Sequence, residues 1–141
     1  MGTSARLPTR LHHTAYVSRD LEATRKFYEE DIGLPLLATW CEKDMLFGAE
    51  RTYAHCFFGL GDGGALAFFQ FADQDDERTF SPPIAETPFH RIALKVDQAT
   101  QAEIEERLQA AGYTASDTFV LEHGYCRSLY IKLDCCDLAG N

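Results

Sequence analysis

The segment LHHTAYVSRDL at residues 11–21 decides how the rest of the chain is interpreted. Its aromatic, β-branched and small apolar side chains are typical of a short strand, and two histidines stand near its start. Asp20 is a candidate helix cap, because its carboxylate can accept hydrogen bonds from the free amides of a first helical turn. Gly33 predicts the end of that helix, since glycine adopts the left-handed conformation, and Pro35 prevents the helix from resuming.

A second copy of this pattern occurs in HRIALKVD at residues 90–97. Residues 12–15 align with residues 90–93 without a gap, so that His13 corresponds to Arg91. We therefore interpret the chain as an internal duplication, and we expect its chemistry where the two copies meet.

The first copy continues with three predicted strands. Residues 34–41 and 52–60 have strand composition and are joined by a loop, and residues 65–71 are apolar enough to be buried on both faces. The GDGG sequence at residues 61–64 predicts a hairpin, because positive φ costs glycine nothing. The first unit is therefore a βαβββ module over about residues 10–72.

Residues 73–88 are acidic and contain two consecutive prolines, which predicts a linker between the copies. The second module is expected over about residues 89–135. Its predicted elements are a strand at 90–96, a helix at 98–111 and strands at 113–121 and 125–132. The helix is expected to begin with a capping box at Thr100 and Glu103 and to bury Ile104, Leu108 and Ala111. Residues 133–141 have poor strand composition, so the second module lacks a clear last strand.

Length and composition predict one soluble globular domain. The chain has 141 residues, with 45% hydrophobic and 12% aromatic side chains, and no stretch approaches the ~18 apolar residues of a membrane span. Its net charge of −9 argues against nucleic acid and anionic membranes as partners. Solubility alone explains such a charge, and attraction of a cationic ligand is the alternative. Five cysteines without a C-x-x-C motif fit a reducing compartment, and we expect a cytoplasmic protein.

The motifs at residues 13–16, 20–21, 27–28 and 33–34, their echo at 91–97 and the segment RSLYI at 127–131 resemble the vicinal oxygen chelate superfamily. That superfamily includes glyoxalase I, extradiol dioxygenases, fosfomycin-resistance enzymes and bleomycin-resistance proteins. The resemblance implies an α+β fold of two tandem βαβββ modules that form a curved mixed sheet around a cleft. It also implies a small-molecule ligand or substrate and a homodimer.

In the metal enzymes of the superfamily, two His and one or two Glu side chains hold a divalent ion such as Fe, Mn, Ni or Zn. Neutral imidazoles and carboxylates suit such ions and leave positions at which a substrate can chelate through neighbouring oxygens. By resemblance, His13 occupies the ligand position of the first strand, and Gln70 and His90 are candidate further ligands. The last carboxylate ligand is expected near Gly140, where the sequence has none.

Arg91 stands at the ligand position of the second copy, and its guanidinium cannot give up a proton to coordinate a metal. It can instead hold a carboxylate, phosphate or enolate oxygen. We take Arg91 and Tyr130 as the candidate catalytic residues. Phe68, at a position where some members of the superfamily have Glu, and Tyr125 are candidate contacts to a flat substrate.

Three functions stay open at this point. The first is a glyoxalase- or dioxygenase-like enzyme that uses a divalent metal held by His13. The second is a metal-free protein of the bleomycin-resistance type that binds a cationic antibiotic, and the third is a degenerate, inactive member of the superfamily.

Overall fold

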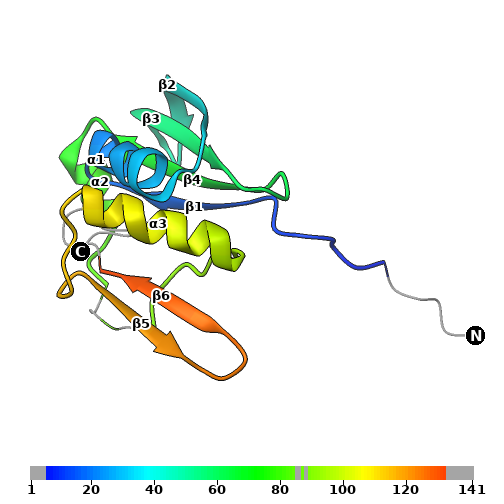
Figure 1. Cartoon of the computed structure of the whole chain (residues 1–141). Coiled ribbons are helices and arrows are strands. Elements are labelled where there is room, and N and C mark those ends of the chain that lie inside the picture. Colours follow the sequence, from blue (N-terminus) through cyan, green and yellow to red (C-terminus); the bar gives the residue numbers. More distant parts are fainter. Residues whose placement is uncertain (1–5, 85–86, 88, 133–141) are drawn as a thin grey trace, which may run out of the picture.

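The computed structural model describes residues 6–84, 87 and 89–132. The elements, in chain order, are β1 (His13–Val17), α1 (Leu21–Arg25), the π-helix η1 (Lys26–Ile32), β2 (Leu36–Leu46), β3 (Ala49–Gly59), β4 (Ala65–Phe71), α2 (Gln74–Phe80), α3 (Gln98–Ala110), β5 (Thr118–Glu122) and β6 (Arg127–Ile131) (Figure 1). Within these described ranges, no helix is long and apolar enough to span a membrane.

The first four strands form one mixed sheet in the order β1-β4-β3-β2. β1 runs parallel to β4, whereas β3 is antiparallel to both of its neighbours. This arrangement confirms the βαβββ order predicted for the first module. β5 and β6 form a separate antiparallel ribbon, and Figure 1 shows α3 between this ribbon and the helix formed by α1 and η1.

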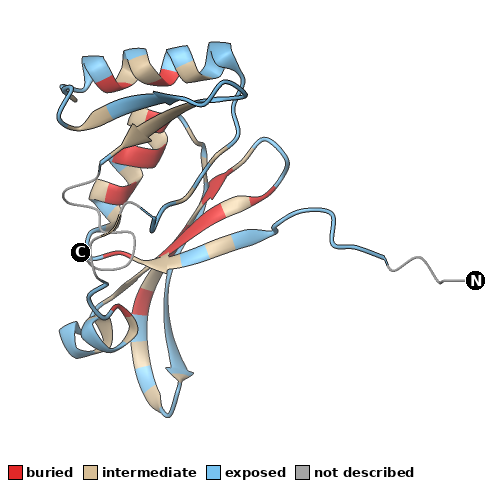
Figure 2. Ribbon diagram, turned by 90° about the horizontal axis from the view of Figure 1, so that it is seen from below, coloured by how far each residue is buried: buried red, intermediate tan, exposed pale blue. Residues whose placement is uncertain are grey.

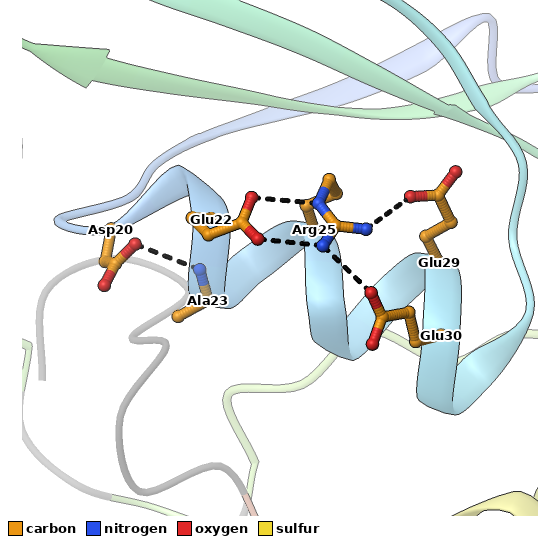
Figure 3. Close-up of polar contacts among 6 residues, drawn as sticks. All are labelled: Asp20, Glu22, Ala23, Arg25, Glu29 and Glu30. Atoms are coloured by element: carbon orange, nitrogen blue, oxygen red, sulfur yellow. Dashed lines mark hydrogen bonds and ion pairs between the residues drawn. The ribbon is translucent and has the colours of Figure 1, made fainter.

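The helix of the first module begins and ends where the sequence predicts. The Asp20 carboxylate accepts a hydrogen bond from the Ala23 amide at 3.0 Å, and Gly33 ends η1 with a left-handed φ of 89°. Figure 3 shows the Arg25 guanidinium bound to the carboxylates of Glu22, Glu29 and Glu30, at 2.7 to 2.9 Å. Because these acidic residues lie on successive turns, one cation connects α1 to η1.

The core lies between this helix and the sheet. Its members are Phe27, Tyr28, Ile32, Cys56, Phe58, Leu66, Phe68, Ile104 and Leu108. Figure 2 shows the buried residues on the sheet and on the inner sides of the helices. β5 and β6 contain no buried residue, and half-buried Leu129 and Ile131 of β6 pack against the core.

The β2–β3 hairpin is longer than the sequence analysis predicts. The expected loop between residues 41 and 52 is instead paired strand up to a two-residue turn at Phe47 and Gly48, whose φ angles are 51° and 82°. Positive φ at both positions matches the right-handed twist of a hairpin, so the strands continue to the turn. The predicted GDGG hairpin at residues 61–64 is confirmed, and the Leu60 amide donates to the Gly64 carbonyl at 2.8 Å.

A helix forms inside the predicted linker. Asp73 accepts hydrogen bonds from the amides of Asp75 and Asp76 and thereby caps α2. The acidic residues that we interpreted as a solvated linker occupy the first turn of α2, where negative charge is favourable. The division of the chain into modules and linker stays a prediction.

The second copy departs from the predicted pattern. The strand predicted at residues 90–96 is not found, although half-buried Ile92 and Leu94 alternate with exposed neighbours. Asp97 caps α3 through the Thr100 amide, so the capping box predicted at Thr100 and Glu103 is wrong. Ile104 and Leu108 are buried as expected, whereas Ala111, the C-cap residue of α3, is exposed. The tandem duplication is not confirmed, and the weak last strand at 133–141 lies outside the described residues.

Arg107 connects α3 to the first module. Its Nη2 donates to the Ile32 carbonyl at 2.7 Å and its Nε donates to the Asp31 carbonyl at 3.1 Å. These carbonyls belong to the last residues of η1, where helices have free acceptors and a cation is favourable. Arg107 therefore satisfies the end of one helix from the side of another.

We expect Arg107→Met to lower the free energy of unfolding by about 1 to 2 kcal/mol, because two charge-assisted hydrogen bonds are lost while the apolar stem stays. Urea unfolding measures the change. The control is Arg78→Met, which removes an exposed ion pair with Asp75 and should cost less than about 0.5 kcal/mol. Equal effects of the two substitutions would contradict this role of Arg107.

Candidate functional site

The sheet has one face that turns away from α1 and η1. Cys56, Phe58, Leu66 and Phe68 belong to the core, and alternate residues of a strand point to opposite faces. We call the opposite side the open face, and it consists of His13, Ala15, Val17, Trp40, Tyr53, His55, Phe57, Ala67, Phe69 and Phe71. Ring contacts support this assignment, since His13 lies 5.6 Å from Phe57 and Phe69 lies 3.7 Å from His55 between ring centroids.

Aromatic side chains occupy one half of the open face. Trp40, His55, Phe69 and Val17 lie in one row across four strands, because each is paired with the next in the strand register. The next row contains Phe57, Ala67 and Ala15 in the same way. The open face therefore carries large side chains on β2 and β3 and small ones on β1.

His13 lies at the start of β1 on this face and is exposed. Its Nδ1 is 2.9 Å from Nδ1 of His12, and the two rings meet edge to face at 5.1 Å between centroids. The predicted site residue is thus placed beside a second imidazole and an aromatic wall.

His55 is a site residue that the sequence patterns did not predict. Its ring is 9% exposed, stacks on Phe69 with 15° between the planes, and also contacts Trp40 and Phe57. Nε2 has no hydrogen-bond partner among the described residues. Burial lowers the pKa of His55, the Glu42 charge opposes this effect, and the charge of His13 adds to it. The signal in the sequence was the alternation along the strand, which places His55 on the same face as Phe57; its pairing with Trp40 appears only in the structure.

Phe68 and Gln70 do not join His13. Phe68 is 1% exposed in the core. Gln70 Oε1 accepts a hydrogen bond from the Leu21 amide at 2.8 Å, at the start of α1. The sequence shows that these two residues share a face of the strand, but that face is the helix side of the sheet.

The structure brings Arg91 and Tyr130 together. The Arg91 guanidinium carbon lies 5.8 Å from the centroid of the Tyr130 ring, which stacks on Phe119 at 4.7 Å. His90 is exposed in a turn, and Tyr125 is 89% exposed at the end of the β5–β6 hairpin. The predicted catalytic pair is therefore adjacent, whereas the Tyr125 ring stacks on His123.

The sequence-family model of the Glyoxalase/Bleomycin resistance protein/Dioxygenase superfamily matches residues 10–141. The chain belongs to this superfamily. No curated protein sequence matches it.

Solved structures of the superfamily share the fold. A glyoxalase family protein from Bacillus cereus has a TM-score of 0.55 and 17% identity, with 86% of this chain and 81% of that chain covered. Lactoylglutathione lyase from Agrobacterium tumefaciens has a TM-score of 0.52 and 21% identity, with 96% and 91% covered. The fosfomycin resistance protein FosX from Listeria monocytogenes has a TM-score of 0.51 and 17% identity, with 88% and 83% covered.

A divalent metal is compatible with the superfamily, but the described donors do not complete a site for one. Across residues 6–84, 87 and 89–132, no three His, Cys, Asp or Glu side chains are placed to share an ion. His12 and His13 offer two imidazoles, and Gln70 points to the other face of the sheet. The carboxylate position expected near Gly140 lies outside the described residues.

We expect His55 to make stability depend on pH. The unfolded chain protonates this imidazole near the ordinary value of about 6.5, whereas the folded protein resists protonation because the ring is buried. As pH falls through that value, the unfolded state binds the additional proton and the free energy of unfolding decreases. Urea unfolding between about pH 7.5 and pH 5.5 should show this decrease in the wild type and a smaller one in His55→Phe.

The control for this measurement is His123→Phe, which changes an exposed histidine. Its pH dependence should equal that of the wild type. The same pH dependence in His55→Phe would contradict the lowered pKa of His55.

Proposed function

We propose that this chain is a small-molecule binding protein of the superfamily, and that it holds a flat, cationic aromatic ligand on the open face. The observation that carries the proposal is the aromatic stack formed by Trp40 and Phe57. Their rings are 5.6 Å apart with 18° between the planes, and Trp40 remains 37% exposed. A planar ligand can extend this stack by one layer.

The charge beside the stack favours a cation. Glu42 follows Trp40 by two residues and therefore lies on the same face of β2. The Tyr53 hydroxyl donates to Glu42 Oε2 at 2.7 Å, and this hydrogen bond is the main reason that the pKa of Tyr53 rises to about 12. Tyr53 thus stays a neutral donor that holds the Glu42 carboxylate next to an aromatic surface. The net charge of −9 attracts cations at longer range.

His55 supplies a polar group in the centre of the same face. Burial keeps its imidazole neutral near pH 7, and its Nε2 is without a partner among the described residues. Because Nε2 is buried, a ligand can accept a hydrogen bond from it or donate one to it, according to the tautomer, only after the ring or a neighbouring side chain moves. The open face therefore combines a stacking surface, one negative charge and one neutral hydrogen-bonding group.

Trp40 is the only tryptophan of the chain, so its fluorescence reports on the open face directly. We expect proflavine, a flat cation, to quench this fluorescence and to bind more tightly than the neutral analogue acridine at about pH 8, with a preference that weakens as salt is added. Phe57→Ala should weaken proflavine binding about fivefold to tenfold, because one stacking partner is lost.

Phe119→Ala is the matched control, since it removes an aromatic ring of β5 that is 51% exposed. It should leave proflavine affinity unchanged. Equal affinity for proflavine and acridine, or an equal loss in both variants, would contradict the proposed ligand class.

A metal-dependent enzyme of the glyoxalase or dioxygenase type is the second candidate. The observation in its favour is the close approach of the His12 and His13 imidazoles at the exposed start of β1. A bound divalent ion would supply Lewis acidity to neighbouring oxygens of a substrate. Such a site needs at least one further donor from residues beyond the described ranges or from a second chain.

Metal analysis separates the two candidates. If the chain is a metalloenzyme, protein purified without chelator should hold close to one equivalent of Fe, Mn, Ni or Zn per chain, and His13→Ala should lose it. His123→Ala is the control and should keep the metal. Less than about a tenth of an equivalent, unchanged by His13→Ala, would remove this candidate.

A further inference from the structure

A pocket of about 350 Å³ lies where β1 and β4 meet the segment that follows α2. Its walls are largely apolar and include Ala15, Val17, Phe69, Phe80, Ser81 and Ile84. The first three belong to the open face. The pocket is therefore a lateral extension of that face toward residues 80–84.

Ser81 is the polar residue that the fold leaves unsatisfied in this wall. It is 5% exposed, and its Oγ has no hydrogen-bond partner among the described residues. Its backbone amide donates to the Glu77 carbonyl at 2.8 Å, so the main chain of Ser81 is held while the hydroxyl is not. A buried hydroxyl without a partner is unfavourable, and a hydrogen bond to a bound group would recover that cost.

The wall that carries Ser81 is fixed before any ligand arrives. The Phe80 ring stacks on Phe71 at 5.2 Å, and the Arg51 guanidinium carbon lies 4.9 Å from the centroid of the Phe80 ring. Arg51 also forms an ion pair with Asp76, in which both side chains are 15% exposed. These contacts hold the end of α2 over the sheet, so little ordering is required when the pocket is filled.

We infer that this pocket is a specificity site, which takes an uncharged ring bearing one hydroxyl or carbonyl group and binds that group through Ser81 Oγ after the buried hydroxyl rotates toward the pocket. This specificity site rests on the proposed function, because it requires that the ligand of the open face also reaches the pocket. From Trp40 to Val17 the row crosses three strand spacings, about 14 Å in total. A ligand of several rings is long enough to stack on Trp40 and to place a substituent in the pocket.

The test uses two small probes that differ in one group, 1-naphthol and 1-methylnaphthalene, at about pH 7. We expect both to shift the backbone amide signals of Ala15, Val17 and Ile84 in ¹⁵N–¹H NMR spectra, and the wild type to bind 1-naphthol about fivefold to tenfold more tightly. Ser81→Ala should remove this preference by weakening 1-naphthol alone. Ala15→Leu, which fills the pocket and keeps the hydroxyl, should weaken both probes.

Equal affinity of the wild type for the two probes would overturn the inference, as would an unchanged preference in Ser81→Ala. Signal shifts confined to residues around Trp40 and His13 would also overturn it. Because neither probe is charged, the outcome is independent of proflavine binding. Loss of proflavine binding in Phe57→Ala together with equal probe affinities would therefore support the proposed function and reject the specificity site.

Discussion

The packing of Tyr28 against Phe58 and Phe68 is the contact on which the rest of the structure depends. The Tyr28 ring lies 5.5 Å from Phe58 and 5.0 Å from Phe68 between centroids, and both phenylalanines are almost fully buried. Once these residues face the helix, the two-residue period of a strand places His55, Phe57 and Phe69 on the other side of the sheet. The same contact thus creates the hydrophobic core and determines which side chains remain for a ligand.

Local signals in the sequence predict the first module well. The Asp20 cap, the Gly33 end and the GDGG hairpin each act through one or two residues, and each is found where expected. Local signals do not reveal elements whose structure depends on a distant contact. α2 forms within an acidic stretch that resembles a linker, and its end is held in place by Arg51 and Phe71 from the sheet. Residues 91–97 alternate like a strand but make no ladder among the described residues.

Some residues of the candidate site could likewise be predicted from the sequence and others could not. His13 on an exposed strand and the neighbouring pair Arg91 and Tyr130 could be proposed from motif positions. The sequence could not show which face of the sheet Phe68 and Gln70 occupy. The alternation of side chains along a strand shows which residues share a face, but not which face packs against the helix. His55 and Ser81 become notable only through what surrounds them, since an unpartnered polar atom is a property of the folded neighbourhood.

The turn of the β2–β3 hairpin illustrates how a locally unfavourable residue can be retained. Phe47 adopts a φ of 51°, which an aromatic residue tolerates poorly and asparagine or glycine would adopt more easily. Its ring lies 5.4 Å from that of Phe80, on the helix end that forms a wall of the pocket. An asparagine at this position would relax the backbone and at the same time withdraw a support from that wall. The residue at the hairpin tip thus accepts an unfavourable backbone conformation and in return contacts a wall of the pocket.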